Sequence, residues 1–268
     1  MVTIVDACVR DGRGGSPTAV VVDDGTMTDE QRRLVPVQAG TSHAAFLGAT
    51  HPGGGQAVRF FTRSGELAGC GHGTIAAQAV LLAAAGLDRR ESRQHTGGRT
   101  FDTVAVRHNK GIEVWFDQGT VTVRPATEDE YGPALPALGI GYPAGGVVSA
   151  SPGTPRLLVP VASREELLSL TPDYEALTVH TRRIGHLGCY VYVAPDAGPA
   201  AARMFAPAIG VPEDLANANS AGCLAAHLYL GGGTPTVEVE QGESIVFASA
   251  HSGPSGVEAR IGGIAIIR

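Results

Sequence analysis

The sequence lacks several features that mark large classes of protein. Lys110 is the single lysine among 20 basic residues, and 26 acidic residues give a net charge of −6. A negative net charge argues against a general binder of nucleic acid or of anionic membranes. No run of about 18 apolar residues is present, so we expect no membrane span. No basic start followed by an apolar run is seen either, so a signal peptide is not indicated and a cytoplasmic location is expected.

Cysteine is also scarce. The four cysteines are Cys8, Cys70, Cys189 and Cys223, and no two of them form a Cys-x-x-Cys pair. Zinc and redox motifs of that kind are therefore not indicated, and reduced thiols are the expected state. We therefore expect no metal site.

What is present describes an ordinary globular chain with two domains. The 268 residues are 43% hydrophobic and 17% charged, a composition typical of globular proteins and a length comfortable for two domains. The stretch from Pro125 to Gly145 is rich in proline, glycine and acid, which favours a boundary near its start. The predicted domains are residues 1–124 and 125–268.

The most informative stretch is Gly69-Cys70-Gly71-His72-Gly73-Thr74, followed by a predicted helix over Ile75–Ala85. Gln78 is the one polar residue of that helix, and Gly86 stands where a helix stop is expected. A helix that is apolar all round is buried on every side. Its N-terminal N–H groups have no intrahelical acceptors and favour an anion such as a carboxylate. The thiolate form of Cys70, just ahead of that end, would be favoured.

The second half of the chain repeats this pattern weakly. Asn217–Ser220 opens a second helix of small residues, which Gly231–Gly233 ends. Each half also contains predicted strands and a short amphipathic helix; the first such helix begins at Thr28, with Gln31 placed for a capping box. The chain ends in two predicted strands, Val257–Ile261 and Ile264–Ile267. Two such halves facing one another would bring two helix N-termini to one cleft, where both stabilise an acidic substrate.

Six short segments, in order along the chain, resemble motifs of one family. They are Gly14–Val20 for G-N-P-x-A-V, Ser42–Phe46 for S-E-T-x-F, Glu66–Thr74 for E-L-P-F-A-G-H-P-T, Arg203–Pro207 for R-x-F-A-P, Glu213–Ser220 for E-D-P-x-T-G-S-A, and Gln241-Gly242 for Q-G. The chain thus resembles the PhzF family of isomerases from phenazine biosynthesis, which has the diaminopimelate-epimerase-like fold.

The resemblance implies an α+β fold of two similar domains, each a β-barrel-like sheet around a central buried helix, with the active site in the cleft. It also implies cofactor-independent acid/base chemistry on a small carboxylic or amino acid, and commonly a homodimer. Members often serve the biosynthesis of antibiotics and other secondary metabolites. These are expectations for the present chain.

The chain departs from the family pattern at three positions. His43 stands where the family has its catalytic Glu, and an imidazole can carry a proton because its unperturbed pKa lies near neutrality. Cys70 replaces an Ala, and the resulting C-G-H-G-T resembles the motif in which a proline racemase has a proton-abstracting Cys. Asn219 replaces the active-site Ser of the family.

The resemblance assigns roles to residues of both halves. His43, Cys70 and Asp214 are the predicted catalytic residues, and Asp214 and His72 are expected to orient the substrate. The predicted substrate-binding residues, several through backbone N–H groups, are Gly71, His72, Gly73, Thr74, Asn219, Ser220 and Gln241.

Three functions remain open on the sequence. The first is an isomerase that moves a proton, and with it a double bond, on a small unsaturated or cyclic acid. The second is an amino-acid racemase or epimerase that uses Cys70 with His43 or Cys223 as the second base. The third is a catalytically inactive protein that binds a small acid, which the loss of the family's Glu motivates.

Overall fold

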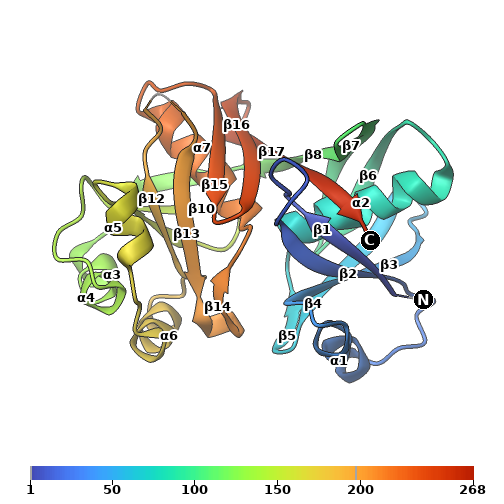
Figure 1. Cartoon of the computed structure of the whole chain (residues 1–268), viewed down its shortest axis with the longest axis horizontal. Helices are drawn as coiled ribbons and strands as arrows, with labels where there is room; N and C mark the ends of the chain where they lie inside the picture. The colour runs from blue at the N-terminus through green and yellow to red at the C-terminus, as the bar shows by residue number, and fades with distance from the viewer. Residues whose placement is uncertain (1, 197) are drawn as a thin grey trace. The chain divides into compact units, whose positions relative to one another are not determined.

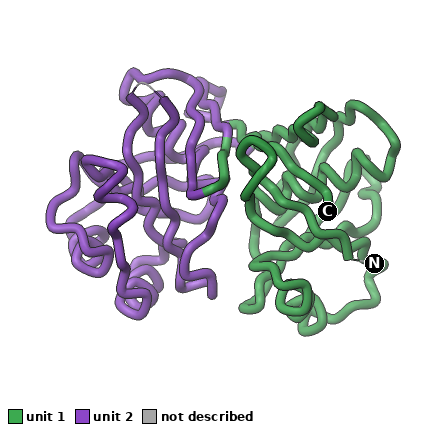
Figure 2. Tube along the Cα trace, in the orientation of Figure 1, with its two compact units in different colours: residues 1–117, 243–246, 260–268 green, residues 118–242, 247–259 purple. Residues whose placement is uncertain are grey.

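The computed structural model describes residues 2–196 and 198–268, which fall into two compact units (Figures 1 and 2). Unit 1 comprises the described residues of Met1–Asp117, Glu243–Val246 and Arg260–Arg268, and unit 2 comprises Gln118–Gly242 and Phe247–Ala259. The division expected at residue 124 differs from this in two respects. The chain first passes from unit 1 to unit 2 after Asp117, seven residues before the expected boundary, and the end of the chain returns to unit 1.

The return of the chain end has a simple cause in strand pairing. The last strand, β17 (Gly256–Ile267), pairs antiparallel with the first, β1 (Val2–Ala7), with Val5 opposite Ile267. Backbone hydrogen bonds between the two ends of the sequence thus complete the sheet of unit 1. A boundary drawn from composition alone does not detect such a pairing.

Unit 1 is built from strands and two helices. In chain order they are β1, β2 (Ser16–Val22), α1 (Asp29–Ala39), β3 (His43–Thr50), β4 (Gln56–Thr62), β5 (Gly65–Leu67), α2 (Gly71–Ala85), β6 (Arg89–Thr96), β7 (Arg99–His108) and β8 (Gly111–Thr120). Helix α1 begins with the predicted capping box between Thr28 and Gln31.

The sheet of unit 1 closes on itself. Its strands pair in the order β17, β1, β2, β3, β4, β6, β7 and β8, and β8 pairs in turn with β17. The pairs β2–β3 and β4–β6 are parallel, and β5 forms a hairpin on β4. Helix α2 packs against β1, β2, β3, β4 and β7. The predicted barrel-like sheet around a central helix is therefore confirmed for this unit.

Helix α2 is buried because nearly all its side chains are apolar. Residues 71–79 and Leu82 are buried, and the helix ends at Gly86, whose left-handed φ of 65° lets its N–H bond back to Leu82 and Ala83. Burial on every side was expected. This is wrong for the last turn, where Ala84 and Ala85 are exposed, because the helix emerges from the barrel there.

The single polar side chain of α2 is satisfied inside the barrel. Gln78 donates from Nε2 to Oε1 of Gln94 on β6 at 2.9 Å, and Gln94 donates to the hydroxyls of Thr74 and Thr96 at 3.1 and 3.0 Å. A buried amide without such partners would cost about 1–3 kcal/mol. This network ties α2 to β6, and it engages the hydroxyl of Thr74, one of the predicted substrate-binding residues.

Unit 2 carries the remaining elements. They are β9 (Thr122–Pro125), α3 (Glu128–Tyr131), α4 (Ala134–Leu138), β10 (Val148–Ser151), β11 (Arg156–Pro160), α5 (Arg164–Ser169), α6 (Tyr174–Arg183), β12 (Cys189–Val193), β13 (Ala200–Ala206), the 3-10 turn η1 (Pro207–Ile209), β14 (Val211–Asp214), α7 (Ala218–Leu230), β15 (Thr236–Gln241) and β16 (Ser244–Gly253). Strand β16 begins in unit 1 and continues into unit 2, and β17 begins in unit 2 and ends in unit 1.

The sheet of unit 2 also wraps a buried helix. Its strands pair in the order β9, β10, β11, β12, β13 and β15, with β14 antiparallel to β13. Helix α7 packs against β9, β10 and β15, and residues 218 and 220–226 are buried. The α+β fold of two similar units, each with one buried helix, is thereby confirmed.

The two strands predicted at the end of the chain are one continuous strand, β17. Gly262 and Gly263 suggested a break, but close packing requires them. A Cβ on Gly262 would lie 2.5 Å from the Trp115 ring, and one on Gly263 would lie 3.0 Å from Sγ of Cys8. Glycine inside a strand here marks a close approach of side chains to the backbone.

Across residues 2–196 and 198–268, none of the helices has the length and apolar character that crossing a membrane requires.

Candidate active site

Three predicted site residues of unit 1 lie together. His43 begins β3, whereas Cys70 and His72 lie at the start of α2. The Cys70 Sγ is 3.4 Å from the His72 Nε2, and one ligand atom from each of the three side chains lies within 4.8 Å of the other two. The rings of His43 and His72 meet edge to face, with centroids 4.4 Å apart. The fold of unit 1 thus brings together two imidazoles and a thiol, although His43 and His72 are 29 residues apart in the sequence.

These three side chains are nearly enclosed. His43 and His72 are 2% exposed and Cys70 is 7% exposed. The Oγ of Ser42 lies 2.8 Å from Nδ1 of His43, a hydrogen bond that holds this side of the ring. A proton carrier held in one orientation by a hydrogen bond on its far nitrogen is what general acid/base catalysis needs.

The start of α2 supplies backbone donors beside this cluster. Cys70 is the N-cap residue, in an extended conformation, and its C=O accepts from the N–H of Thr74. The N–H groups of Gly71, His72 and Gly73 therefore precede the first helical hydrogen bond and favour an anion. A Cβ on Gly73 would lie 2.8 Å from the Phe60 ring and 2.9 Å from Cys70 Sγ. Gly73 is thus required for the thiol to lie where it does.

The predicted residues of unit 2 form a second set. Asp214 ends β14 and is 4% exposed. Its Oδ2 accepts from Asn217 Nδ2 at 2.9 Å and its Oδ1 from the N–H of Ala216 at 3.3 Å. Gln241 accepts from the N–H of Asn217 at 2.9 Å, whereas its own Nε2 is buried without a hydrogen-bond partner among the described residues. An unsatisfied buried amide donor is consistent with the predicted role of Gln241 in binding an acid.

The role expected for the N–H of Ser220 needs correction. That N–H donates to Oδ1 of Asn217, which caps α7, and Ser220 is fully buried with its hydroxyl 3.2 Å from Nη1 of Arg156. The capping bond occupies the donor that was expected to hold a carboxylate. Asn219, one residue earlier, is partly exposed, and its C=O accepts from Nε2 of Gln118.

Sequence reasoning missed Arg156 and Tyr190 at this second set. Arg156 is 2% exposed, and its Nε, like the hydroxyl of Tyr190, has no hydrogen-bond partner in the part of the chain that the structure describes. Burial raises the pKa of Tyr190 well above its ordinary value, and the charges of Cys223 and Asp214 raise it further. The sequence did contain a sign of Arg156, because this arginine begins an otherwise apolar strand, R-L-L-V-P. An arginine in such a strand is unusual, since arginine is rarely buried.

The other cysteines do not share the character of Cys70. Cys8, Cys189 and Cys223 are each 0% exposed. Burial raises the pKa of the Cys189 thiol to about 12 and also raises the pKa of Cys223. Cys223 therefore does not fit the part of second base that the racemase hypothesis offered it, because a general base must reach its substrate in deprotonated form.

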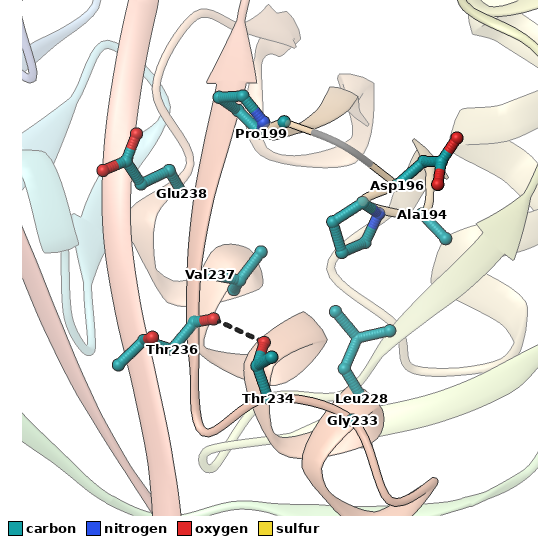
Figure 3. A pocket seen from close by; sticks show the side chains of 11 residues that line it. Ala194, Asp196, Pro199, Leu228, Gly233, Thr234, Thr236, Val237 and Glu238 are labelled. Atoms are coloured by element: carbon teal, nitrogen blue, oxygen red, sulfur yellow. Dashed lines mark hydrogen bonds between the residues drawn. The ribbon is translucent and has the colours of Figure 1, made fainter.

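Unit 2 also contains a cavity of about 590 Å³ (Figure 3). Leu228, Val237 and Thr234 line it, and the Thr234 hydroxyl donates to the carbonyl of Thr236. No predicted site residue contributes to its walls.

Comparison with known proteins agrees with the fold and with the family resemblance. The family model for phenazine biosynthesis-like proteins, PhzC-PhzF, matches residues 5–251. The trans-2,3-dihydro-3-hydroxyanthranilate isomerase of Pseudomonas fluorescens is 30% identical over 258 residues, which cover 92% of this chain and 89% of that protein.

Solved structures share the whole fold. A predicted epimerase from Pseudomonas aeruginosa superposes with a TM-score of 0.85 at 22% identity, covering 100% of this chain and 96% of that one. A hydroxyproline epimerase from Agrobacterium vitis has a TM-score of 0.68 at 16% identity, covering 100% of this chain and 90% of that one. The family match over most of the chain decides the matter: the chain belongs to the phenazine biosynthesis-like PhzC-PhzF family and is a PhzF-like isomerase.

Proposed function

We propose that the protein moves a proton, and with it a double bond, along one face of a small unsaturated or cyclic carboxylic or amino acid. The observation that carries the proposal is the cluster of His43, Cys70 and His72, whose reactive atoms lie within 4.8 Å of one another. In this reaction His43 takes the proton from one carbon and returns it to another. Cys70 acts as a second acid/base or stabilises developing charge.

The spacing favours this isomerisation over racemisation by His43 and Cys70. A two-base racemase holds the α-carbon between its bases, and each base stands about 3–3.5 Å from that carbon. The bases of such an enzyme are therefore about 6–7 Å apart. One ring nitrogen of His43 lies within 4.8 Å of the Cys70 Sγ, which is shorter than the separation that a two-base racemase needs. Both groups then act on the same side of the substrate.

The negative charge that develops on the substrate needs donors. The N–H groups of Gly71 and Gly73 at the start of α2 supply them, because a helix N-terminus stabilises a carboxylate or an enolate. Asp214, Asn219 and Gln241 are included in the proposal as the groups of unit 2 that orient the substrate, on the strength of the family motifs and the buried Nε2 of Gln241.

The substrate class follows from the relative. A first compound to assay is trans-2,3-dihydro-3-hydroxyanthranilate, which the name of the P. fluorescens isomerase specifies. Because His43 replaces a carboxylate, cyclic amino acids with a different acidity at the reacting carbon belong in the same assay. A role in secondary metabolism and a homodimeric state are part of this proposal.

The test compares the kcat of the wild type with that of variants in which His43 is replaced. His43→Gln keeps a polar side chain of similar size without a basic nitrogen, and it should lower kcat by about 10²–10⁴-fold, the range of general acid/base catalysis. The control is His251→Gln, an exposed histidine, which should keep full activity. Full activity in His43→Gln would remove His43 from the mechanism, and tight ligand binding without turnover by the wild type would favour a binding protein.

A further inference from the structure

We propose that His43, Cys70 and His72 also form a site for one Zn²⁺ ion, and that zinc bound there stops the proton transfer. Two imidazoles and one thiolate make a donor set that zinc prefers. All three side chains are buried, and their ligand atoms lie within 4.8 Å of one another. The absence of a Cys-x-x-Cys pair gave no sign of this set, because its members come from the start of β3 and from two positions at the start of α2.

The spacing of the donors matches tetrahedral zinc. Bonds of about 2.3 Å to sulfur and about 2.0–2.1 Å to nitrogen at the tetrahedral angle place the sulfur about 3.5 Å from the nitrogen. The Cys70 Sγ lies 3.4 Å from the His72 Nε2. A ring nitrogen of His43 completes a set of three ligand atoms that lie within 4.8 Å of one another, and the fourth position stays open, as in catalytic rather than structural zinc sites.

The surroundings of the ligands are suited to a metal. The Ser42 Oγ holds Nδ1 of His43 at 2.8 Å, and a hydrogen bond on the outer nitrogen of a histidine ligand orients the ring toward the ion. The Cys70 thiol loses its proton to solvent as the sulfur–zinc bond forms, because a coordinated thiol is deprotonated. The thiolate offsets the unfavourable effect of the positive end of α2 on a cation.

Two of the three ligands, His43 and Cys70, stand at positions where the chain departs from the family motif that it resembles. Position 43 has His in place of Glu, and position 70 has Cys in place of Ala. With alanine at position 70, one of the three ligands, and the one with the strongest preference for zinc over magnesium or calcium, would be missing. The zinc site is therefore a property of this sequence rather than of the fold.

Inhibition follows from competition for lone pairs, and this part rests on the proposed function. The nitrogen of His43 that accepts a proton from the substrate is the one that would bind the metal, because Ser42 engages the other nitrogen. A nitrogen that is bound to zinc cannot act as a base. Zinc at a stoichiometric amount is thus expected to abolish turnover, and a chelator is expected to restore it.

The binding test uses zinc alone and requires no substrate. Protein freed of metal by a chelator is titrated with Zn²⁺ against a chromophoric zinc indicator. We expect one tight site per chain, weakened by more than about 100-fold in Cys70→Ala and by about 10–100-fold in Ser42→Ala, which removes only the group that orients a ligand. His95→Gln serves as the matched control because His95 stacks on His51 outside the cluster, with both ring nitrogens already hydrogen-bonded.

Cobalt gives a readout that does not depend on the variants folding. Co²⁺ bound to the wild-type protein should show a thiolate-to-metal charge-transfer absorption, and alkylation of Cys70 should remove it. Absence of that absorption, absence of tight zinc binding, or loss of binding in His95→Gln with retention in Cys70→Ala would each overturn the proposal. Zinc binding without any effect on a measured turnover would overturn only the inhibition, and failure to find a substrate leaves the binding result intact.

Discussion

The Cys70 Sγ lies 3.4 Å from the His72 Nε2, at the first turn of a helix that the barrel of unit 1 encloses. A thiol next to an imidazole and a helix N-terminus is in the environment that activates cysteines. We therefore predict that iodoacetamide modifies Cys70 first, since Cys70 is 7% exposed whereas Cys8, Cys189 and Cys223 are each 0% exposed. Peptide mapping by mass spectrometry identifies the modified residue. Equal labelling of all four thiols in the native protein would contradict this picture of the site.

Gly73 should tolerate no side chain, whereas Gly69, at the start of the same motif, should tolerate one. An alanine at position 73 places its Cβ 2.8 Å from the Phe60 ring, and overpacking of this kind costs about 1–3 kcal/mol. Gly69→Ala is the matched control because nothing lies within 4 Å of a Cβ there. Chemical denaturation of both variants measures the difference. A Gly73→Ala protein as stable and as active as Gly69→Ala would show that the thiol is not confined as described.

Asn217 links the cap of α7 to Asp214. Its Oδ1 accepts from the N–H of Ser220 and its Nδ2 donates to Asp214, both at 2.9 Å. Asn217→Ala should lower the free energy of unfolding by about 2–3 kcal/mol, because it removes a cap and a partner of a buried carboxylate. Ser163→Ala removes the exposed cap of α5 and should cost only about 1 kcal/mol. Equal losses in urea denaturation would mean that the bond to Asp214 contributes nothing.

Glu130 should make the stability of the protein depend on pH in the acid range. Its hydrogen bond with Arg124, helped by the N–H of Thr127, lowers the pKa of its carboxyl from 4.5 to about 2. A lowered folded-state pKa gives stability that is present above the unfolded value and is lost as the pH falls from about 4.5 toward about 2.

The comparison that isolates this effect is wild type against Glu130→Gln. Arg124 is 54% exposed at its side chain, so solvent screening limits the contribution to about 1 kcal/mol. The advantage of the wild type in urea denaturation should shrink between pH 5 and about pH 2. Glu128→Gln, on the exposed side of α3, is the control. An advantage that stays constant across this range would contradict the lowered pKa.

Much of the fold could be predicted because local signals and burial agree. The capping box at Thr28, the apolar helix before Gly86 and the small-residue helix after Asn217 all appear where the pattern places them. Strand β6 could not be found, because its sequence R-R-E-S-R-Q-H-T is almost wholly polar. Its buried members are Gln94 and Thr96, which are satisfied by the polar network around Gln78.

The candidate site was predictable where motif positions carry it. His43, Cys70 and His72 were singled out from sequence, and the structure brings them together. Arg156 and Tyr190 were missed, because a buried charge or hydroxyl has no periodic pattern and its neighbours are set by pairing between distant strands. The assignment of the Ser220 N–H failed for a local reason, since the side chain of Asn217 occupies that donor.

The central claim is that His43 and Cys70 act on one face of the substrate. The most direct measurement is the turnover of a substrate in D₂O, with the labelled carbon and the configuration at the α-carbon determined by NMR. The account predicts deuterium at a carbon other than the α-carbon, with a shifted double bond, and a kcat about 10²–10⁴-fold lower in His43→Gln. Deuterium at the α-carbon with inversion, and no movement of a double bond, would contradict it.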